Sequence, residues 1–115
     1  MESKFSQYVD RDEIVRIVCE LVRHNTVNPP GNEHLCKAIV TECMESLGME
    51  VSYHEKEPGR TNVVGRIGKG EKSIGFVSHM DVVPPGEIDQ WNTPPFEPTI
   101  NDGRIYGRGT LDDKG

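Results

Sequence analysis

The sequence predicts an α/β fold, with a mixed sheet flanked by helices, and three observations indicate it. Apolar residues recur at helical spacing twice within the first 48 residues. Beyond residue 50 the apolar period becomes two, and short apolar runs alternate with turn-forming residues. The length of 115 residues suits one domain, so residues 1–115 are expected to form a single compact body.

Two helices are expected in the first half of the chain. Asp10 followed by Glu13 matches a capping box, and the apolar spacing predicts a helix from there up to residue 23. Asn28-Pro29-Pro30-Gly31 interrupts the helical pattern, because proline cannot continue the backbone hydrogen bonds. Asn32 is expected to cap a second helix that ends at Gly48. The apolar face of this helix is predicted to consist of Leu35, Ile39, Cys43 and Leu47.

The second half of the chain is expected to contain short strands and one long loop. Residues 82–98 include five prolines and the only tryptophan, Trp91, and a loop of this length is usually functional or disordered. Asn101-Asp102-Gly103 is a tight-turn signal. Strands are predicted around residues 51–53 and at 62–67, 73–78 and 104–106.

Composition excludes several classes of function. The net charge is −6 and no basic run is present, which argues against nucleic acid as a partner. No stretch of about 20 apolar residues and no signal-peptide pattern occur, so no membrane association and a cytoplasmic location are expected. The three cysteines are odd in number and fall within helical patterns, which is typical of a reducing compartment and not of a disulfide framework.

The run from residue 76 to residue 81 carries the sharpest local signal for chemistry. His79 and Asp81 stand two positions apart at the end of an apolar strand, so their side chains can point the same way. A metal-bound histidine usually donates its other ring N–H to a carboxylate or carbonyl, a role that suits Asp81. The alternative is a strand-end histidine that is hydrogen-bonded and binds no ion.

A second signal lies in residues 107–115, which are rich in glycine and include the acidic pair Asp112-Asp113. Glycines would let the backbone bring a carboxylate close to a ligand. The alternative is a solvated acidic turn. Other motifs fail on spacing: residues 65–70 lack the Ser or Thr of a phosphate-binding loop and are expected to form a hairpin turn, and the sequence patterns of serine hydrolases, zinc ribbons and zincins do not occur.

Four motifs, in this order and spacing, resemble the amino-terminal part of the acetylornithine deacetylase, succinyl-diaminopimelate desuccinylase, aminoacylase and carboxypeptidase G family of di-zinc hydrolases. They are Thr26-Val27-Asn28-Pro29-Pro30-Gly31-Asn32-Glu33, residues 75–84, Trp91 with Pro95-Phe96, and residues 102–109. The resemblance implies a zinc-exopeptidase-like catalytic domain, of which residues 1–115 are the amino-terminal portion. The lid and dimerisation domain and the remaining catalytic part would lie outside this sequence.

The resemblance also implies roles for single residues. His79 would be a zinc ligand, Asp81 the catalytic-site residue that steadies the imidazole, and Asp112 the ligand that bridges two metal ions. Asp113 stands where the family often has methionine, and the choice of Asp112 rests on the alignment of residues 107–109. A cis peptide bond between Asp112 and Asp113 is expected. The cofactor is expected to be two Zn²⁺ ions per complete site, with Co²⁺ or Mn²⁺ also accepted by such ligands.

The function implied is hydrolysis of an amide bond in an N-acyl amino acid or a short peptide. The general base, a Glu-Glu pair and further ligands of the family fall beyond residue 115, so this chain is expected to be an inactive fragment on its own. The alternative function is a non-catalytic interaction module that pairs through an exposed sheet edge, including with a second copy as a homodimer.

Overall fold

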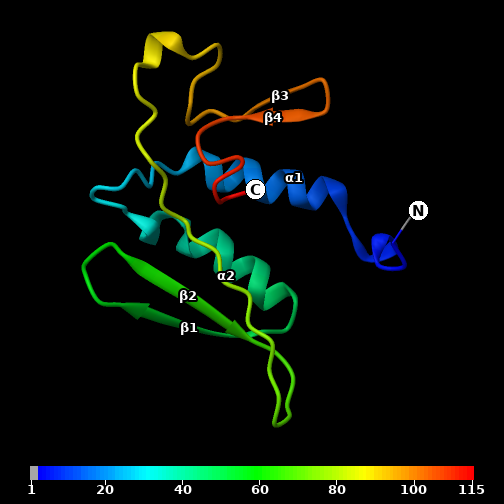
Figure 1. Cartoon of the computed structure of the whole chain (residues 1–115). Helices are drawn as coiled ribbons and strands as arrows, with labels where there is room; N and C mark the ends of the chain where they lie inside the picture. The colour runs from blue at the N-terminus through cyan, green and yellow to red at the C-terminus, as the bar shows by residue number, and fades with distance from the viewer. Residues whose placement is uncertain (1–2) are drawn as a thin grey trace.

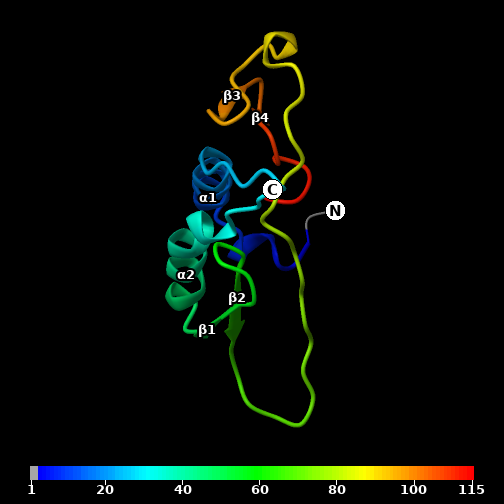
Figure 2. The same cartoon turned by 90° about the vertical axis from the view of Figure 1, so that its left-hand side faces the viewer.

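The computed structural model describes residues 3–115 and confirms the α/β class: two helices pack between two β-hairpins (Figure 1). In Figure 2 the helices lie on one side of the larger hairpin, and the extended segment after it runs along the other side. Short 3-10 turns occupy Ser6–Tyr8, Glu33–Cys36 and Ile88–Gln90. The regular elements are α1 (Arg11–Arg23), α2 (Lys37–Ser46), β1 (Glu50–Glu55), β2 (Thr61–Arg66), β3 (Thr99–Asn101) and β4 (Arg104–Tyr106).

Helix α1 begins where the sequence predicts. The side chain of Asp10 accepts a hydrogen bond from the backbone N–H of Glu13 at 3.0 Å, which satisfies one of the free donors at the helix start. The reciprocal half of the predicted capping box is absent among the hydrogen bonds of the described residues. The carboxylate of Glu13 accepts two bonds from Arg16 instead, at 2.8 and 2.9 Å. The cap is therefore one-sided.

Helix α2 differs from the prediction at its start and in its buried face. Asn32 adopts a left-handed conformation and makes no capping bond, and the chain enters α2 through the 3-10 turn. Leu35 and Leu47, predicted to face the core, are 40% and 65% exposed, whereas Cys36 is fully buried. A 3-10 turn advances three residues per turn and not 3.6, which shifts the buried side from position 35 to position 36.

The core is formed mainly where the two helices meet. Its buried cluster consists of Leu21, Cys36 and Ile39, with Val22 of α1 fully buried nearby. The end of α2 matches the prediction, because Gly48 takes a left-handed conformation (φ 77°) and its N–H bonds to the carbonyl of Glu45 at 2.9 Å. The core thus depends on helix packing, to which the strands add little buried apolar surface.

The strands form two separate antiparallel pairs, β1 with β2 and β3 with β4. The β3–β4 turn is the predicted one, with Asp102 (φ 48°) and Gly103 (φ 71°) both left-handed, as a tight hairpin requires. The strand predicted at residues 73–78 is wrong for the described structure, because this segment pairs with no other. Its apolar side chains are open to solvent: Ile74 is 86%, Phe76 94% and Val77 98% exposed. A strand needs a hydrogen-bonded neighbour, and no segment of residues 3–115 supplies one.

A single parallel bridge, between Val27 and Val82, ties the middle of the chain to the segment that follows α1. The N–H of Val82 donates to the carbonyl of Thr26 at 3.1 Å, and the N–H of Asn28 donates to the carbonyl of Val82 at 2.9 Å. The fully buried Thr26 adds a hydroxyl bond to the carbonyl of Met80 at 2.6 Å. Residues 80–82 are therefore held against residues 26–28. Over residues 3–115, the structure includes no helix with the length and apolar character of a membrane span.

We expect Thr26→Val to destabilise the protein by about 1–3 kcal/mol, because it leaves the carbonyl of Met80 without its hydroxyl partner. Amide hydrogen exchange at Val82 and Asn28 should accelerate together, which NMR can follow. Thr26→Ser keeps the hydroxyl and should keep these amides protected. Equal exchange in the two variants would contradict the role given to this bond.

Candidate metal centre

The imidazole of His79 is oriented by the residue two positions along the chain. Its Nδ1 lies 2.9 Å from the backbone carbonyl of Asp81 and 3.4 Å from the carboxylate oxygen Oδ1 of the same residue. The shorter contact makes Nδ1 the protonated nitrogen, because a carbonyl oxygen only accepts. Orientation of the ring by Asp81 was expected through its carboxylate, and the closer partner is its backbone.

The other ring nitrogen faces the terminal loop. Nε2 of His79 lies 2.9 Å from Oδ1 of Asp112, although the two residues are 33 positions apart. With the proton on Nδ1, Nε2 presents a lone pair to a carboxylate oxygen that also presents lone pairs. Two such bases stay this close only with a cation between them, either a proton or a metal ion. Both side chains are open to solvent, at 52% and 82% exposure.

The spacing of these two atoms is close to that of two ligands on one zinc ion. Zinc ligands at 2.0–2.1 Å with tetrahedral angles lie about 3.3 Å apart. The observed 2.9 Å between Nε2 and Oδ1 would widen by a few tenths of an ångström on metal binding. Imidazole nitrogen and carboxylate oxygen are both donors that zinc accepts. His79 and Asp112 therefore fit a shared zinc ion, while no group of three His, Cys, Asp or Glu side chains within residues 3–115 could hold one.

The terminal loop reaches His79 because its glycines permit close packing. A Cβ atom on Gly107 would lie 2.7 Å from a methyl carbon of Val22, and one on Gly109 would lie 2.8 Å from a methyl carbon of Val82. Gly109 also has a positive φ of 91°, which disfavours any side chain. The peptide bond between Asp112 and Asp113 is cis, as the resemblance implied. The glycine-rich pattern thus reflects contact with α1 and with residue 82.

The two neighbouring acids of the loop point to different partners. Asp112 faces the imidazole, whereas the carboxylate of Asp113 accepts a hydrogen bond from the hydroxyl of Ser78 at 2.8 Å. The backbone N–H of His79 also lies 3.4 Å from the same Asp113 oxygen. The geometry agrees with the choice of Asp112 as the ligand, and the ligand roles of His79 and Asp112 stay predictions.

The sequence did not single out the groups that hold Asp81. The amide of Asn28 donates to its carboxylate at 2.9 Å, and Arg60 lies 3.8 Å from the same oxygen. Arg60 is itself held by Glu33, a buried carboxylate, at 2.6 Å. Asn28 and Glu33 belong to the motif of residues 26–33, but the partner of Asn28 lies 53 positions away and that of Glu33 lies 27 positions away. Only their place in a recognised motif could have indicated them.

These contacts shift two pKa values in opposite directions. The bond from Asn28 is the main cause that lowers the pKa of Asp81, with smaller help from His79 and Arg60. The carbonyl of Asp81 is the main cause that raises the pKa of His79, and Asp112 acts in the same direction. Asp81 is therefore held ionised. The raised pKa of His79 means that its imidazole binds a proton more readily than a free one.

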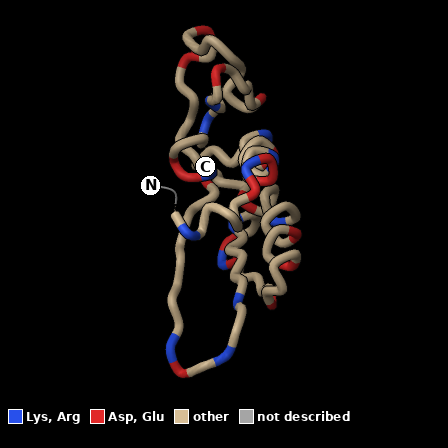
Figure 3. The backbone as a smooth tube through the Cα atoms, turned by 90° about the vertical axis from the view of Figure 1, so that its right-hand side faces the viewer, with Lys and Arg blue, Asp and Glu red and all other residues tan. Residues whose placement is uncertain are grey.

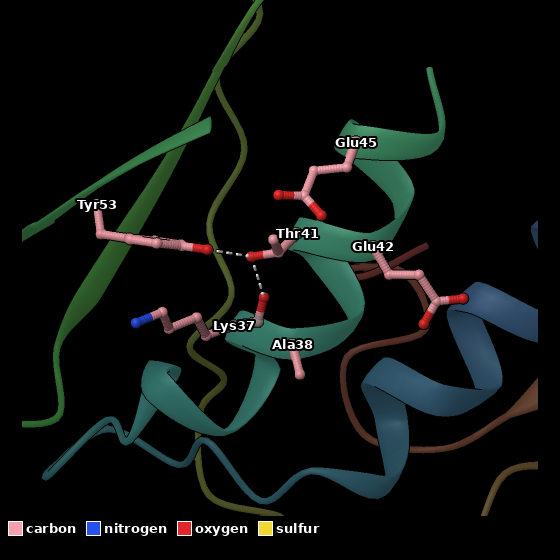
Figure 4. Close-up of a pocket in the computed structure, with 6 residues that line it drawn as sticks. All are labelled: Lys37, Ala38, Thr41, Glu42, Glu45 and Tyr53. Atoms are coloured by element: carbon pink, nitrogen blue, oxygen red, sulfur yellow. Dashed lines mark hydrogen bonds between the residues drawn. The ribbon is translucent and has the colours of Figure 1, made fainter. Parts of the chain in front are cut away.

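Two hollows lie elsewhere on the molecule, and neither is lined by His79, Asp81 or Asp112. One lies between α2 and β1, where the hydroxyls of Thr41 and Tyr53 are 3.0 Å apart (Figure 4). The other, of about 560 Å³, lies beside the loop that contains Trp91, whose ring centroid is 5.1 Å from the guanidinium carbon of Arg108. Figure 3 shows acidic and basic residues interspersed along the backbone, without one continuous charged face.

We expect Asn28→Ala to raise the pKa of Asp81, because the amide donor that favours the ionised carboxyl is lost. A carboxyl with a lowered pKa stabilises the fold at pH above its ordinary value of 3.8, and this contribution disappears as the pH falls through the folded value. Acid unfolding of the variant should therefore begin at higher pH. Carboxyl ¹³C shifts of metal-free protein would measure it, with the exposed Asn92→Ala as control. An unchanged Asp81 titration in Asn28→Ala would refute the assignment.

Parts of this chain are similar to known peptidases. Residues 75–115, which contain His79, Asp81 and Asp112, match the family described as peptidase family M20/M25/M40. The structure matches that of human carnosine dipeptidase 1 with a TM-score of 0.73 and 27% sequence identity over 94% of this chain. The chain spans 27% of the length of that dipeptidase. Both matches are to peptidases, and the α/β fold of this chain is that of the corresponding part of the dipeptidase.

Proposed function

We propose that this chain is the amino-terminal part of a metal-dependent hydrolase of amide bonds, related to the M20/M25/M40 peptidases. The observation that carries the proposal is the 2.9 Å approach of His79 Nε2 to Asp112 Oδ1, across 33 positions of sequence. The match of residues 75–115 to that peptidase family supports it independently of the geometry. The finer assignment, to the deacetylase and desuccinylase group, rests on the four sequence motifs.

The residues of this chain would prepare and hold the ion. Asp81 fixes the ring with its carbonyl, so that the lone pair of Nε2 faces Asp112. Asp112 contributes a carboxylate whose second oxygen is free to reach a second ion, as a bridging ligand would. Asn28 and Arg60 keep the carboxylate of Asp81 charged. Zinc bound there would supply an activated water and polarise the amide carbonyl.

The substrate class proposed is an N-acyl amino acid or a short peptide. The structural neighbour, human carnosine dipeptidase 1, is a dipeptidase, which supports a small amide substrate.

Residues 1–115 are proposed to be inactive when isolated. A catalytic zinc takes about three protein ligands, whereas His79 and Asp112 supply at most two to either ion. Among residues 3–115 no third ligand lies close enough to complete a site. A carboxylate base for the attacking water would likewise come from further chain.

Zinc titration of the purified 115-residue chain tests the site by calorimetry. We expect weak binding that His79→Ala and Asp112→Ala each reduce by at least about tenfold, since each removes one of two ligands. His54→Ala is the matched control, because that histidine lies on β1 in the exposed part of the hairpin. Tight binding of two ions would contradict the proposal that the isolated chain lacks a complete site. Equal zinc affinity in all variants would refute the assignment of His79 and Asp112 as ligands.

Hydrolysis is tested with the zinc-loaded protein in its full natural length. A panel of dipeptides and N-acetyl and N-succinyl amino acids should include substrates whose cleavage His79→Ala lowers by at least about a hundredfold in kcat/KM. Asp81→Asn should lower kcat/KM less than His79→Ala does, because the backbone carbonyl still orients the ring. The absence of any cleavage by loaded protein would refute the function.

One observation favours a second candidate, an interaction module. The unpaired segment at residues 73–78 exposes apolar side chains together with free backbone donors and acceptors, which is the feature of a sheet edge that recruits another strand. A stable dimer of the chain that disappears in Val77→Lys, with no zinc effect from His79→Ala, would favour this candidate.

A further inference from the structure

Lys114 is a buried cation that neither the sequence pattern nor the proposed chemistry explains. Only 6% of the residue is exposed. Its ammonium donates to the backbone carbonyl of Leu21 at 2.9 Å and to that of His24 at 2.8 Å. These carbonyls lie at the carboxyl end of α1, 93 and 90 positions earlier in the chain. Figure 1 shows the terminal segment lying against this helix.

The end of a helix suits such a cation. The last carbonyls of an α-helix receive no bond from a following helical turn, and the helix dipole places partial negative charge there. The carbonyl of Leu21 accepts from the backbone N–H of His24 at 3.2 Å as well as from Lys114. The ammonium group carries three donors, of which two are used on these carbonyls. Burial of a charge is costly unless it is hydrogen-bonded, so the contact is specific in position. Lys114 thus caps α1 from outside the helix.

Lys114 is also the buried anchor of an otherwise open loop. Leu111 is 90% exposed and the side chain of Asp112 is 82% exposed. The backbone N–H of Lys114 bonds to the carbonyl of Gly109 at 3.0 Å, which closes the loop that contains Asp112. A shift of Lys114 would therefore move Asp112 with it.

Three successive residues of this loop make side-chain contacts with two parts of the chain, residues 78–79 and the end of α1. Asp112 meets the ring of His79, Asp113 accepts from Ser78, and Lys114 binds the end of α1. The contacts of Asp112 and Asp113 both reach the same exposed segment, residues 78–79, so they cannot locate that segment relative to the helices. The contact of Lys114 joins the loop to the helical core.

We propose that Lys114 is a positioning residue: by binding the carboxyl-terminal carbonyls of α1, it holds the carboxylate of Asp112 against the imidazole of His79. The use of that carboxylate as a metal ligand rests on the proposed function, but the contact itself exists without metal. The side chain of Lys114 touches no substrate or ion in this role. Lys114 acts only by fixing the position of Asp112, two residues earlier in the chain.

The contact can be measured in the metal-free 115-residue chain by NMR. We expect nuclear Overhauser contacts between the ring protons of His79 and the β-protons of Asp112 in the natural sequence. Lys114→Met, which keeps the apolar stem and removes the ammonium, should lose them. Lys114→Arg, which restores a cationic donor, should recover them at least in part.

Two control variants separate positioning from general stability. Ile39→Ala leaves a cavity in the core cluster beside Leu21. It should destabilise the fold while the contact between His79 and Asp112 persists. Lys72→Met removes an exposed lysine of the loop before His79 and should change nothing. Loss of the contact in Ile39→Ala to the same extent as in Lys114→Met would overturn the proposal. So would its persistence in Lys114→Met.

A second measurement covers the case in which Lys114→Met does not fold, and separates the proposal from the proposed function. Mn²⁺ added to folded Lys114→Gln, which keeps one donor, should broaden the signals of His79 and Asp112 unequally, with affinity about tenfold weaker than in the natural sequence. Equal broadening at unchanged affinity would overturn the proposal. The natural sequence could show no broadening while the contact between the His79 ring and Asp112 still depends on Lys114. That result would refute the proposed metal site and leave the positioning role of Lys114 intact.

Discussion

The parallel contact between residues 26–28 and residues 80–82 is the constraint on which the site depends. It joins the segment after α1 to a stretch of chain that has no sheet partner of its own. The buried hydroxyl of Thr26 and two backbone hydrogen bonds fix the positions of Met80 and Val82. They thereby fix the position of the adjacent His79 relative to the segment after α1. This contact, together with the bonds of Ser78 and His79 to the terminal loop, attaches the end of the run from residue 67 to residue 79 to the helical part of the structure.

A polar network continues from the same contact. Asn28 follows Val27 in the paired segment and binds the carboxylate of Asp81, while Arg60 links that carboxylate to the buried Glu33. Asn28, next to the bridge residue Val27, thereby binds Asp81, the residue that orients the imidazole of His79. Packing and electrostatics are coupled here because both use the same few residues, so a change that loosens the bridge would also alter the charge state around His79.

At residues 73–78 the structure differs from the strand that the apolar sequence pattern predicts. Its composition is that of a buried strand, and Phe76 and Val77 are nevertheless almost fully exposed. Apolar β-forming residues indicate that a segment can join a sheet, but the pairing itself needs a neighbour at the right distance. β1 pairs with β2 and β3 with β4 because a short turn brings each pair of strands together.

The sequence by itself determined what depends on neighbouring residues: the two helices, the cap at Asp10 and the β3–β4 turn. The candidate pair His79 and Asp112 was indicated by the family resemblance of the surrounding motifs. Only the tertiary structure decided that Cys36 and not Leu35 faces the core, and that Lys114 closes α1. Helical period, capping and turn chemistry act over a few residues and leave a readable pattern. A contact across 90 positions leaves none, because any polar residue at the right place in space could have made it.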